Sequence, residues 1–263
     1  MNPVVVERGT GPIVLGFPHV GTWLPAAVAE QLTPRGAALA DTDWHVDRLY
    51  AGLLPTATTV RATFHRYVID ANRPPDDSSL YPGQHSTGLV PLTDFDGEPI
   101  WRTAPGAADV DARRRAFHAP YHDAMRAELD RVRAAHGVAL LVDCHSIRSV
   151  IPYLFEGTLP DINIGTVDGR SCGARVSAAT REVLGAPHPY RVVFNARFKG
   201  GWTTREYGRP SQGIHALQIE LAQRTHLTTE SPPFDFDDTR AAPLRALLRT
   251  LLSTLDTLAP TLA

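Results

Sequence analysis

The sequence lacks most of the features that would place it in a specialised class. It has only two cysteines, Cys144 and Cys172, which excludes a disulfide framework. Its 26 basic and 28 acidic residues leave a net charge of −2, so neither a nucleic acid nor a membrane is an expected partner. Residues 1–14 lack the basic start and long apolar core of a signal peptide, and no apolar stretch approaches the roughly 20 residues that span a bilayer. We therefore expect a cytoplasmic protein.

The remaining composition is that of an ordinary globular protein. Hydrophobic residues make up 43% of the chain and charged residues 21%. No internal repeat and no linker-like segment divides the sequence, so we expect residues 1–263 to form one domain. Nothing in the sequence indicates the oligomeric state. The unusual count is that of histidine, with 11 residues, several of them beside Asp, Gly or Pro.

Strand-like and helix-like patterns alternate along the chain. The expected strands are 12–17, 58–70, 138–144, 190–195 and 214–221, and the expected helices are 26–33, 43–53, 107–136, 171–184 and 239–258. Pro120 falls inside the longest helix and should kink or split it. Residues 74–105 form a long loop of the kind that is usually functional or mobile. This alternation predicts an α/β fold with a mixed, mostly parallel central sheet flanked by helices.

Several polar side chains follow directly after the predicted strands. His19 follows the first strand, Asn72 and Arg73 follow the second, and the third, LLVDC, leads straight into His145. Ligands of α/β proteins bind where loops leave the carboxyl ends of the strands. These residues are therefore expected to meet at one edge of the sheet, although they are far apart in the sequence.

Two histidines and a carboxylate, with a fourth position left for water, form a common catalytic zinc site. His19 and His145 can supply the two imidazoles. Asp43, in the segment DTDWHVD, is our choice for the carboxylate, and its competitors in the same segment are Asp41, His45 and Asp47. A metal ion held in this way lowers the pKa of a bound water from 15.7 to about 7.

Two further carboxylates fit this chemistry. Asp143 shares one side of an extended strand with His145 and would orient that histidine. Glu220 lies in the apolar run ALQIEL, where burying an unpaired carboxylate is costly. It is the candidate base that takes a proton from water and passes it to a leaving amine. A structural ion pair with an arginine is the alternative interpretation of Glu220.

Each of these residues also has a structural interpretation. A histidine beside proline or at the end of a strand is more often a surface residue than a metal ligand. The aspartates of DTDWHVD could instead stabilise the N-terminus of a helix through capping and the helix dipole. Cys144 could act as a nucleophile only if its side chain shared a side with His145, but adjacent strand residues point to opposite faces. We therefore expect Cys144 to be a small core residue.

Longer segments of the chain resemble a known family. The sequence is similar to the N-formylglutamate amidohydrolases in five stretches: FPHVGTWLP, DTDWHVDRLY, RYVIDANRPP, DCHS and FNARFKGGWTTREYGRPSQGIHALQIELAQRTHL. Together these stretches extend from about residue 13 to residue 227, and the block around FKGGWTTREYG is the most specific. VDCHSI, VIDANRPP and LQIEL also resemble the DxHS, NR and glutamate segments of zinc carboxypeptidases, which occur in the same order along the chain.

The resemblance implies a zinc-dependent amidohydrolase with a zinc-carboxypeptidase-like (phosphorylase/hydrolase-like) fold. Its reaction would be hydrolysis of the linear amide of N-formyl-L-glutamate to formate and L-glutamate, in histidine degradation, with zinc or another divalent metal. This small-molecule dicarboxylate needs two cationic anchors, and arginine suits carboxylates because its planar fork donates two parallel hydrogen bonds. The NR match assigns one anchor to Asn72 and Arg73. Arg205, with Lys199 and Gly200 nearby, is the candidate for the other.

The match to zinc carboxypeptidases has one gap. Their first metal site reads HxxE, whereas the third residue after His19 is Thr22, so a carboxylate from DTDWHVD would have to replace the glutamate. Two other functions stay open. One is a related metal-dependent hydrolase of another N-acyl amino acid or of a C-terminal peptide bond, which a substrate panel would identify. The other is a non-catalytic protein that binds small anions, for which metal analysis would find empty sites.

Overall fold

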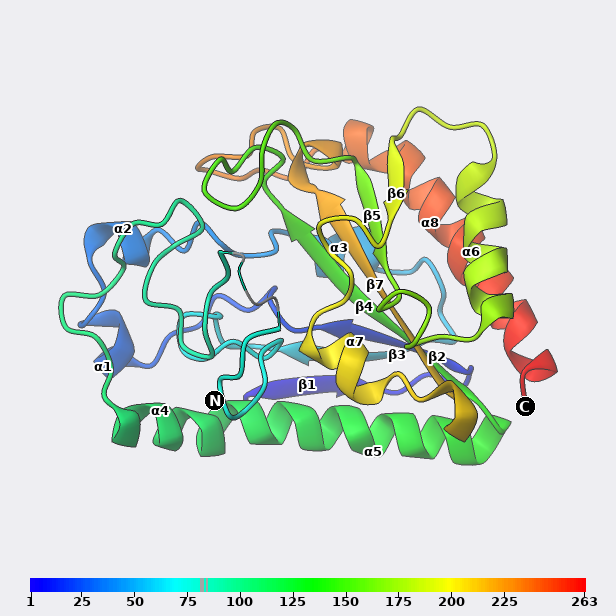
Figure 1. Ribbon diagram of the computed structural model, residues 1–263, viewed down its shortest axis with the longest axis horizontal. Helices are drawn as coiled ribbons and strands as arrows, with labels where there is room; N and C mark the ends of the chain where they lie inside the picture. Colours follow the sequence, from blue (N-terminus) through cyan, green and yellow to red (C-terminus); the bar gives the residue numbers. More distant parts are fainter. Residues whose placement is uncertain (81–82, 84) are drawn as a thin grey trace.

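Within the residues that the computed structural model describes, 1–80, 83 and 85–263, a seven-stranded sheet lies between two layers of helices (Figure 1). In spatial order the sheet is β1-β3-β2-β4-β7-β5-β6. In chain order the strands are β1 (Val4–Glu7), β2 (Ile13–Phe17), β3 (Thr58–Ala62), β4 (Ala139–Ile147), β5 (Ile162–Gly165), β6 (Val192–Phe194) and β7 (Ile214–Ala222).

The centre of the sheet is parallel and its edges are mixed. Strands β3, β2, β4 and β7 run in one direction, whereas β1 is antiparallel to β3 and β5 is antiparallel to β7. The prediction of a mixed, mostly parallel sheet flanked by helices is therefore confirmed. Every residue of β4 and β7 is buried, as expected for strands that are covered on both faces. Their register pairs Asp143 with Gln218 and His145 with Glu220.

The long helices are divided between the two faces of the sheet (Figure 1). The short helices are α1 (Ala26–Ala29), α2 (Pro34–Ala37), α3 (Val46–Tyr50), α4 (Ala107–Arg113) and α7 (Trp202–Tyr207), and the long ones are α5 (Ala119–His136), α6 (Ala174–Gly185) and α8 (Asp238–Leu258). In Figure 1, α4 and α5 run along the lower edge, and α6 and α8 lie on the opposite side of the sheet. Among the described residues, no helix is both long and apolar enough to cross a membrane.

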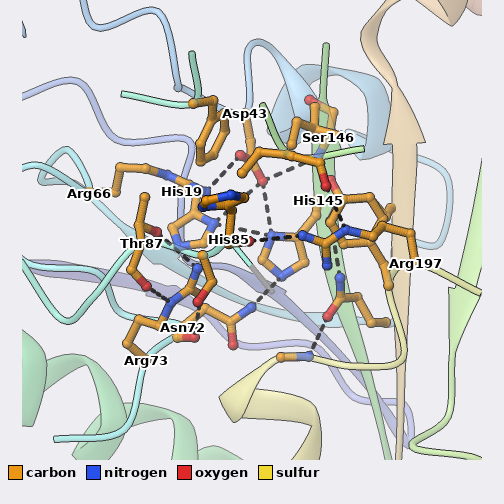
Figure 2. A pocket seen from close by; sticks show the side chains of 18 residues that line it. His19, Asp43, Arg66, Asn72, Arg73, His85, Thr87, His145, Ser146 and Arg197 are labelled. Atoms are coloured by element: carbon orange, nitrogen blue, oxygen red, sulfur yellow. Dashed lines mark hydrogen bonds and ion pairs between the residues drawn. The ribbon is translucent and has the colours of Figure 1, made fainter. Parts of the chain in front are cut away.

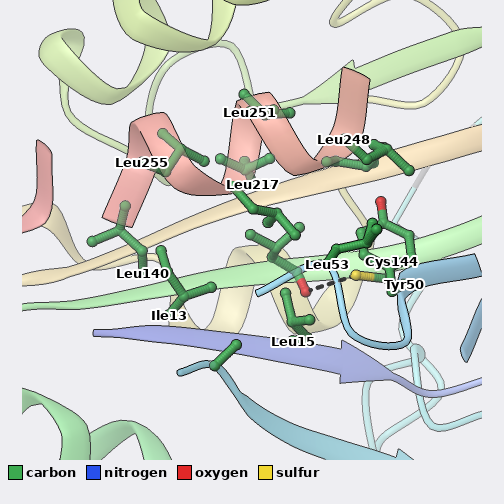
Figure 3. Close-up of a cluster of buried hydrophobic side chains, with 14 of the residues drawn as sticks. Ile13, Leu15, Tyr50, Leu53, Leu140, Cys144, Leu217, Leu248, Leu251 and Leu255 are labelled. Carbon is green, nitrogen blue, oxygen red and sulfur yellow. Dashed lines mark hydrogen bonds between the residues drawn. The ribbon is translucent and has the colours of Figure 1, made fainter. Parts of the chain in front are cut away.

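Alternate strand residues supply two separate cores. Leu15, Leu140 and Leu217 face α3, α6 and α8, and their cluster includes the leucine side of α8 (Figure 3). Val14 and Leu141 face the other way and pack with Tyr121 and Met125 of α5 and with other buried aromatic residues. A fully buried side chain of this size contributes roughly 1.5–3 kcal/mol, so both layers hold the sheet in place.

The longest helical segment contains a wide turn instead of the expected break. A π-helical turn, Arg114–His118, joins α4 to α5, and the backbone N–H of Ala119 donates to the carbonyl of Arg114, five residues earlier. Pro120 is the second residue of α5 and therefore comes just after this turn. A proline inside a regular helix clashes with the carbonyl four residues back, which here belongs to Ala116 within the wide turn. The helix consequently continues through Pro120 without splitting.

The predicted strand 58–70 was too long. Strand β3 ends at Ala62, and the chain then turns. Within this turn, the backbone N–H of Tyr67 donates to His65 Nδ1 at 3.1 Å. The β-branched and aromatic residues that suggested a strand lie instead in a buried turn that leads to Asp70 and Asn72. The sequence patterns also missed the short strands β1 and β5 and the helix α7.

Candidate functional site

Three potential metal ligands meet at the carboxyl ends of the central strands. His19 follows β2, His145 lies near the end of β4, and Asp43 precedes α3, where its backbone N–H donates to the carbonyl of His19 at 3.0 Å. His145 Nδ1 lies 3.2 Å from His19 Nδ1 and 3.0 Å from Asp43 Oδ2. One donor atom from each residue lies within 4.8 Å of the others, and all three side chains are buried (Figure 2). We call these residues the His–Asp–His cluster.

The second nitrogen of each histidine faces a carboxylate. His19 Nε2 lies 2.6 Å from Asp70 Oδ1, and His145 Nε2 lies 3.1 Å from Asp143 Oδ1. Metal-binding histidines commonly donate their other N–H to such a partner, which orients the ring and leaves the inner nitrogen available as a ligand. The two histidines, one carboxylate and two outer carboxylates therefore fit a divalent metal ion of the zinc type.

The charges in the cluster compensate one another. Burial by itself would raise the pKa of Asp43, but the Arg66 guanidinium, 3.1 Å from Asp43 Oδ1, and the neighbouring imidazoles hold it well below its usual value. Burial would lower the pKa of His145, but Asp143 and Asp43 raise it well above its ordinary value. Asp43 is therefore ionised and ready to bind a cation, whereas a metal would have to displace a proton from His145.

Glu220 stands beside the cluster on the neighbouring strand. It is paired in register with His145, and its Oε2 accepts a hydrogen bond from Gln218 Nε2 at 3.0 Å. The other end of the Gln218 amide accepts the backbone N–H of Gly201 at 2.6 Å, so the orientation of the amide is fixed. Burial raises the pKa of Glu220 to about 8, although His145 opposes that shift. A carboxyl group with this pKa can both accept and return a proton near neutral pH.

One cavity contains the cluster, Glu220 and three arginines (Figure 2). Arg66 is buried against Asp43. Arg73 is held by Thr87, whose carbonyl accepts from Nε at 2.7 Å and whose hydroxyl accepts from Nη2 at 2.9 Å. Arg197 donates to the carbonyls of Leu154 and His85, each at 3.1 Å. The remaining polar lining comes from Asn72, His85, Ser86, Thr87, Ser146, Gly201 and Gln218.

The structure separates Asp43 from its competitors. Asp41 accepts hydrogen bonds from the Tyr67 hydroxyl and the Phe95 backbone, at 2.8 and 2.9 Å, and burial raises its pKa to about 7. His45 Nε2 donates to the carbonyl of Phe234 at 3.0 Å. Asp47, the third competitor, lies on α3, and its Oδ2 is 4.0 Å from Nε of Arg61 on β3. Within the described part of the chain, Asp43 is the member of this segment that joins the two histidines.

The predicted second anchor lies elsewhere. Lys199 pairs with Asp168 at 3.2 Å, and its side chain is 44% exposed. Arg205 donates from Nε to the carbonyl of Gly200 at 2.9 Å, and it borders a different surface pocket beside Trp202. Lys199, Gly200 and Arg205 are absent from the described lining of the cavity, where Arg197 supplies the additional cation. The chain turns at Gly200, and the side chains of Lys199 and Arg205 lie outside the cavity, so the structure does not bring these predicted residues to the cluster.

Two other contributors were missed. Asp70, the outer partner of His19, lies in the same VIDANRPP segment as Asn72, so this segment contained the signal. Gln218 shares a side of β7 with Glu220, which the two-residue spacing of a strand could have suggested. Cys144 is buried in the apolar core on the opposite face from His145, as expected, and its thiol donates to the carbonyl of Val142.

The fold and the site define a class of protein: an α/β protein with a candidate metal centre at the carboxyl ends of its strands. The comparisons with known proteins agree. The sequence model of the N-formylglutamate amidohydrolases matches residues 11–227, and the chain belongs to that family. The N-formylglutamate deformylase of Pseudomonas aeruginosa is 45% identical over 252 residues, which covers 95% of this chain and 94% of that protein. The deformylase of Pseudomonas putida is 43% identical with the same coverage.

Solved structures share the fold. The N-formylglutamate amidohydrolase of Ralstonia eutropha JMP134 superposes with a TM-score of 0.80 at 25% identity and covers 97% of each chain. A protein from Agrobacterium tumefaciens gives a TM-score of 0.75 at 21% identity, over 98% of this chain and 96% of that one. The second likeness is one of fold alone.

Proposed function

We propose that this chain hydrolyses N-formyl-L-glutamate to formate and L-glutamate, as a zinc-dependent deformylase. The observation that carries the proposal is the cavity, in which the His–Asp–His cluster, Glu220 and the side chains of Arg73 and Arg197 face one another. The names of the two curated relatives, each covering 95% of the chain, support this choice of substrate. The proposal includes a cytoplasmic location, a role in histidine degradation and one catalytic domain that spans the chain.

His19, Asp43 and His145 would hold the metal. Zinc is our choice because two imidazoles, one carboxylate and an open position are a common catalytic zinc set, although another divalent metal could take its place. When bound, the metal supplies a Lewis acid and a water acidic enough to be deprotonated near pH 7. Asp70 and Asp143, beside the outer nitrogens of the two histidines, would keep the inner nitrogens available as ligands.

Glu220 performs the proton transfers in this proposal. Its carboxylate accepts a proton from the attacking water and then returns that proton to the nitrogen that becomes the amine of glutamate. Gln218 holds Oε2, which limits the directions in which the carboxylate can turn. Burial raises the pKa of Glu220 in the metal-free site, which makes its ionised form a stronger base than an exposed glutamate.

The arginines provide the charge that the substrate requires. Arg73 and Arg197 would each bind one of the two carboxylates, through hydrogen bonds strengthened by charge. Arg66 is buried beside Asp43 and cannot move far, so its positive charge is best placed to stabilise the negative charge that develops on the formyl oxygen. The three cations divide the work between binding and catalysis.

The test is the release of glutamate from N-formyl-L-glutamate by purified protein, measured before and after treatment with a chelator and after addition of zinc. We expect release that the chelator abolishes and zinc restores, and metal analysis should find about one ion per chain. His145→Ala should lose both the metal and the activity.

A parallel panel separates the proposal from its rivals. N-acetyl-L-glutamate, N-formyl-L-aspartate and a peptide ending in glutamate would be assayed under the same conditions. Faster cleavage of any of these would move the substrate to another acyl amino acid or to a peptide bond. Metal-free protein that binds glutamate but cleaves none of the compounds, even with added zinc, would indicate an anion-binding protein instead.

A further inference from the structure

The segment 67–73 connects several parts of the candidate site. Asp70 faces His19, and it also accepts the backbone N–H of Asn72 at 2.8 Å. The side-chain nitrogen of Asn72 lies 3.1 Å from His145 Nε2, and the next residue, Arg73, enters the cavity. A shift of this backbone would therefore disturb both histidines and one arginine together.

The continuous helix formed by α4, the π turn and α5, called here the α4–α5 helix, contacts this segment from outside the cavity. His118 Nε2 lies 2.9 Å from the carbonyl oxygen of Arg73, and His122 Nε2 lies 2.8 Å from the carbonyl oxygen of Ala71. Arg113 Nη1 donates to the carbonyl of Val68 at 3.2 Å. Arg113 Nη1 also donates to the carbonyl of Tyr67 at 3.4 Å, so three side chains of the helix contact four carbonyls of the segment 67–73.

The π turn makes this alignment possible. Arg113 and His118 are five residues apart, and in a regular α-helix such residues point about 140° away from each other. In a π turn, where hydrogen bonds join residues five apart, they share a face. The bond from Ala119 to Arg114 shows this wide turn between the two donors. His118 and His122, four apart, then follow ordinary helical spacing.

The chemistry of both histidines fits a donor role. A carbonyl oxygen can only accept, so each Nε2 must carry hydrogen. His122 Nδ1 lies 2.9 Å from the Tyr207 hydroxyl, and the Trp202 ring packs against both imidazoles, with centroids 5.3 and 4.3 Å away. Burial lowers the pKa of each histidine, which keeps the rings neutral. They are neutral donors and lie outside the described lining of the cavity.

We propose that His118 and His122 are positioning residues for the reaction, which hold the backbone of residues 71–73 so that Asn72 and Arg73 keep their places at the metal cluster. The expected effect on substrate rests on the proposed reaction. The expected effect on zinc rests only on the proposed metal site and can be measured without any turnover. His118 acts on the carbonyl of Arg73 and should chiefly affect substrate binding. His122 acts on Ala71, between Asp70 and Asn72, and should chiefly affect the metal.

The test compares two replacements at each position. Glutamine retains an N–H donor at the end of the side chain, whereas methionine is of similar size and has none. For His118→Met we expect KM to rise about tenfold with a smaller change in kcat, and for His122→Met we expect zinc affinity to fall about tenfold, as for other residues that orient metal ligands. The glutamine variants should recover most of each loss. Zinc affinity is measured by competition with a coloured chelator and needs no turnover.

Leu129→Ala serves as the control on the same helix. Leu129 is 1% exposed and packs in the core, so its loss lowers the stability of the helix without removing a donor. It should leave KM and zinc affinity unchanged. The proposal is overturned if the methionine variants bind zinc and substrate like the parent, or if Leu129→Ala shifts both as much as they do. If a methionine variant fails to fold, the glutamine variant at the same position decides. A folded glutamine variant whose KM or zinc affinity is far from the parent's value, although it keeps the N–H donor, would overturn the proposal.

The two failures are distinguishable. If the parent protein does not cleave N-formylglutamate, the proposed function fails, and the zinc affinities of the His122 variants still decide the inference. If the parent cleaves it and these variants bind and turn over normally, only the inference fails.

Discussion

The helices on the two faces of the sheet bury different kinds of side chain. α8 buries only apolar residues: Ala241, Leu244, Leu248, Leu251, Leu252 and Leu255. The α4–α5 helix also buries apolar residues, but among them are Arg113, His118, His122 and Glu128. Because an unpaired polar group is costly to bury, each of these needs partners. Arg113, His118 and His122 all contact carbonyls of the segment 67–73, and Arg113 also pairs with Asp109 at 2.6 Å. The α8 face contributes stability, whereas the α4–α5 face contributes stability and also holds the segment 67–73.

The largest expected effect is a loss of activity caused by a substitution in the candidate site, without a loss of stability. Glu220→Gln is expected to lower kcat by roughly 10²–10⁴-fold while zinc stays bound, because the change removes proton transfer and no metal ligand. Steady-state kinetics and metal analysis of the same sample check this. Turnover at the parent's rate would exclude Glu220 as the base.

The stability of that variant provides a second comparison. The folded protein raises the pKa of Glu220 to about 8, above its ordinary 4.5, so ionising this group costs stability as the pH rises between those values. Metal-free Glu220→Gln should therefore match the parent near pH 4.5 and exceed it above pH 8. Urea unfolding at both pH values measures the difference.

A change on the α8 face should have the opposite profile. Leu248 is fully buried, and Leu248→Ala is expected to lower the free energy of unfolding by about 2–5 kcal/mol. Since α8 contributes no residue to the described lining of the cavity, kcat and KM per folded molecule should not change. A changed KM in the folded fraction would show that the two faces are coupled.

A histidine near α8 should affect stability alone. Burial lowers the pKa of His226 to about 4, and its backbone carbonyl accepts from Asp237, the residue that caps α8. Below pH 6.5, His226 becomes protonated in the unfolded chain but stays neutral in the folded protein. The free energy of unfolding therefore falls as the pH decreases from 6.5 towards 4. The full loss is about 3 kcal/mol. In His226→Gln, unfolding free energies between pH 7 and 4 should decline less steeply than in the parent.

The smallest effect tests the assignment of the second anchor. Arg197→Gln should raise KM for N-formylglutamate by about 10–100-fold, since a hydrogen bond to a charged group contributes roughly 1.5–3 kcal/mol. Arg205→Gln is the matched control, because Arg205 belongs to the same segment but borders a different pocket. The reverse pattern of KM values would restore the anchor that the sequence suggested.

The sequence indicated the fold well where periodicity and burial coincide. Continuous apolar runs marked β4 and β7, and the leucine spacing marked α8. From the rule that ligands bind at the carboxyl ends of strands, we predicted that His19 and His145 lie close together, and the structure places them so. The turn after β3 was misjudged because its aromatic residues are buried without being extended.

Within the site, the sequence alone could not predict features that depend on tertiary geometry. Lys199 and Arg205 have the right charge, but their direction depends on the turn at Gly200, which has a φ of 122° and follows no strand or helix pattern. The π turn likewise has no simple signature, so the helical pattern could not reveal that His118 and His122 face the segment 67–73. These features depend on contacts between distant residues.

The register of β4 and β7 also limits how this family can change in evolution. His145 and Glu220 are adjacent across two parallel strands, so their separation is set by the spacing of about 4.8 Å between neighbouring strands and not by side-chain packing. Loops at the rim can gain or lose residues without altering that spacing. A single insertion within β4 would instead exchange the faces of the strand and bring Cys144 or Ser146 to the position of His145. Length variation among descendants of this chain should therefore be found in the loops and be absent from these two strands.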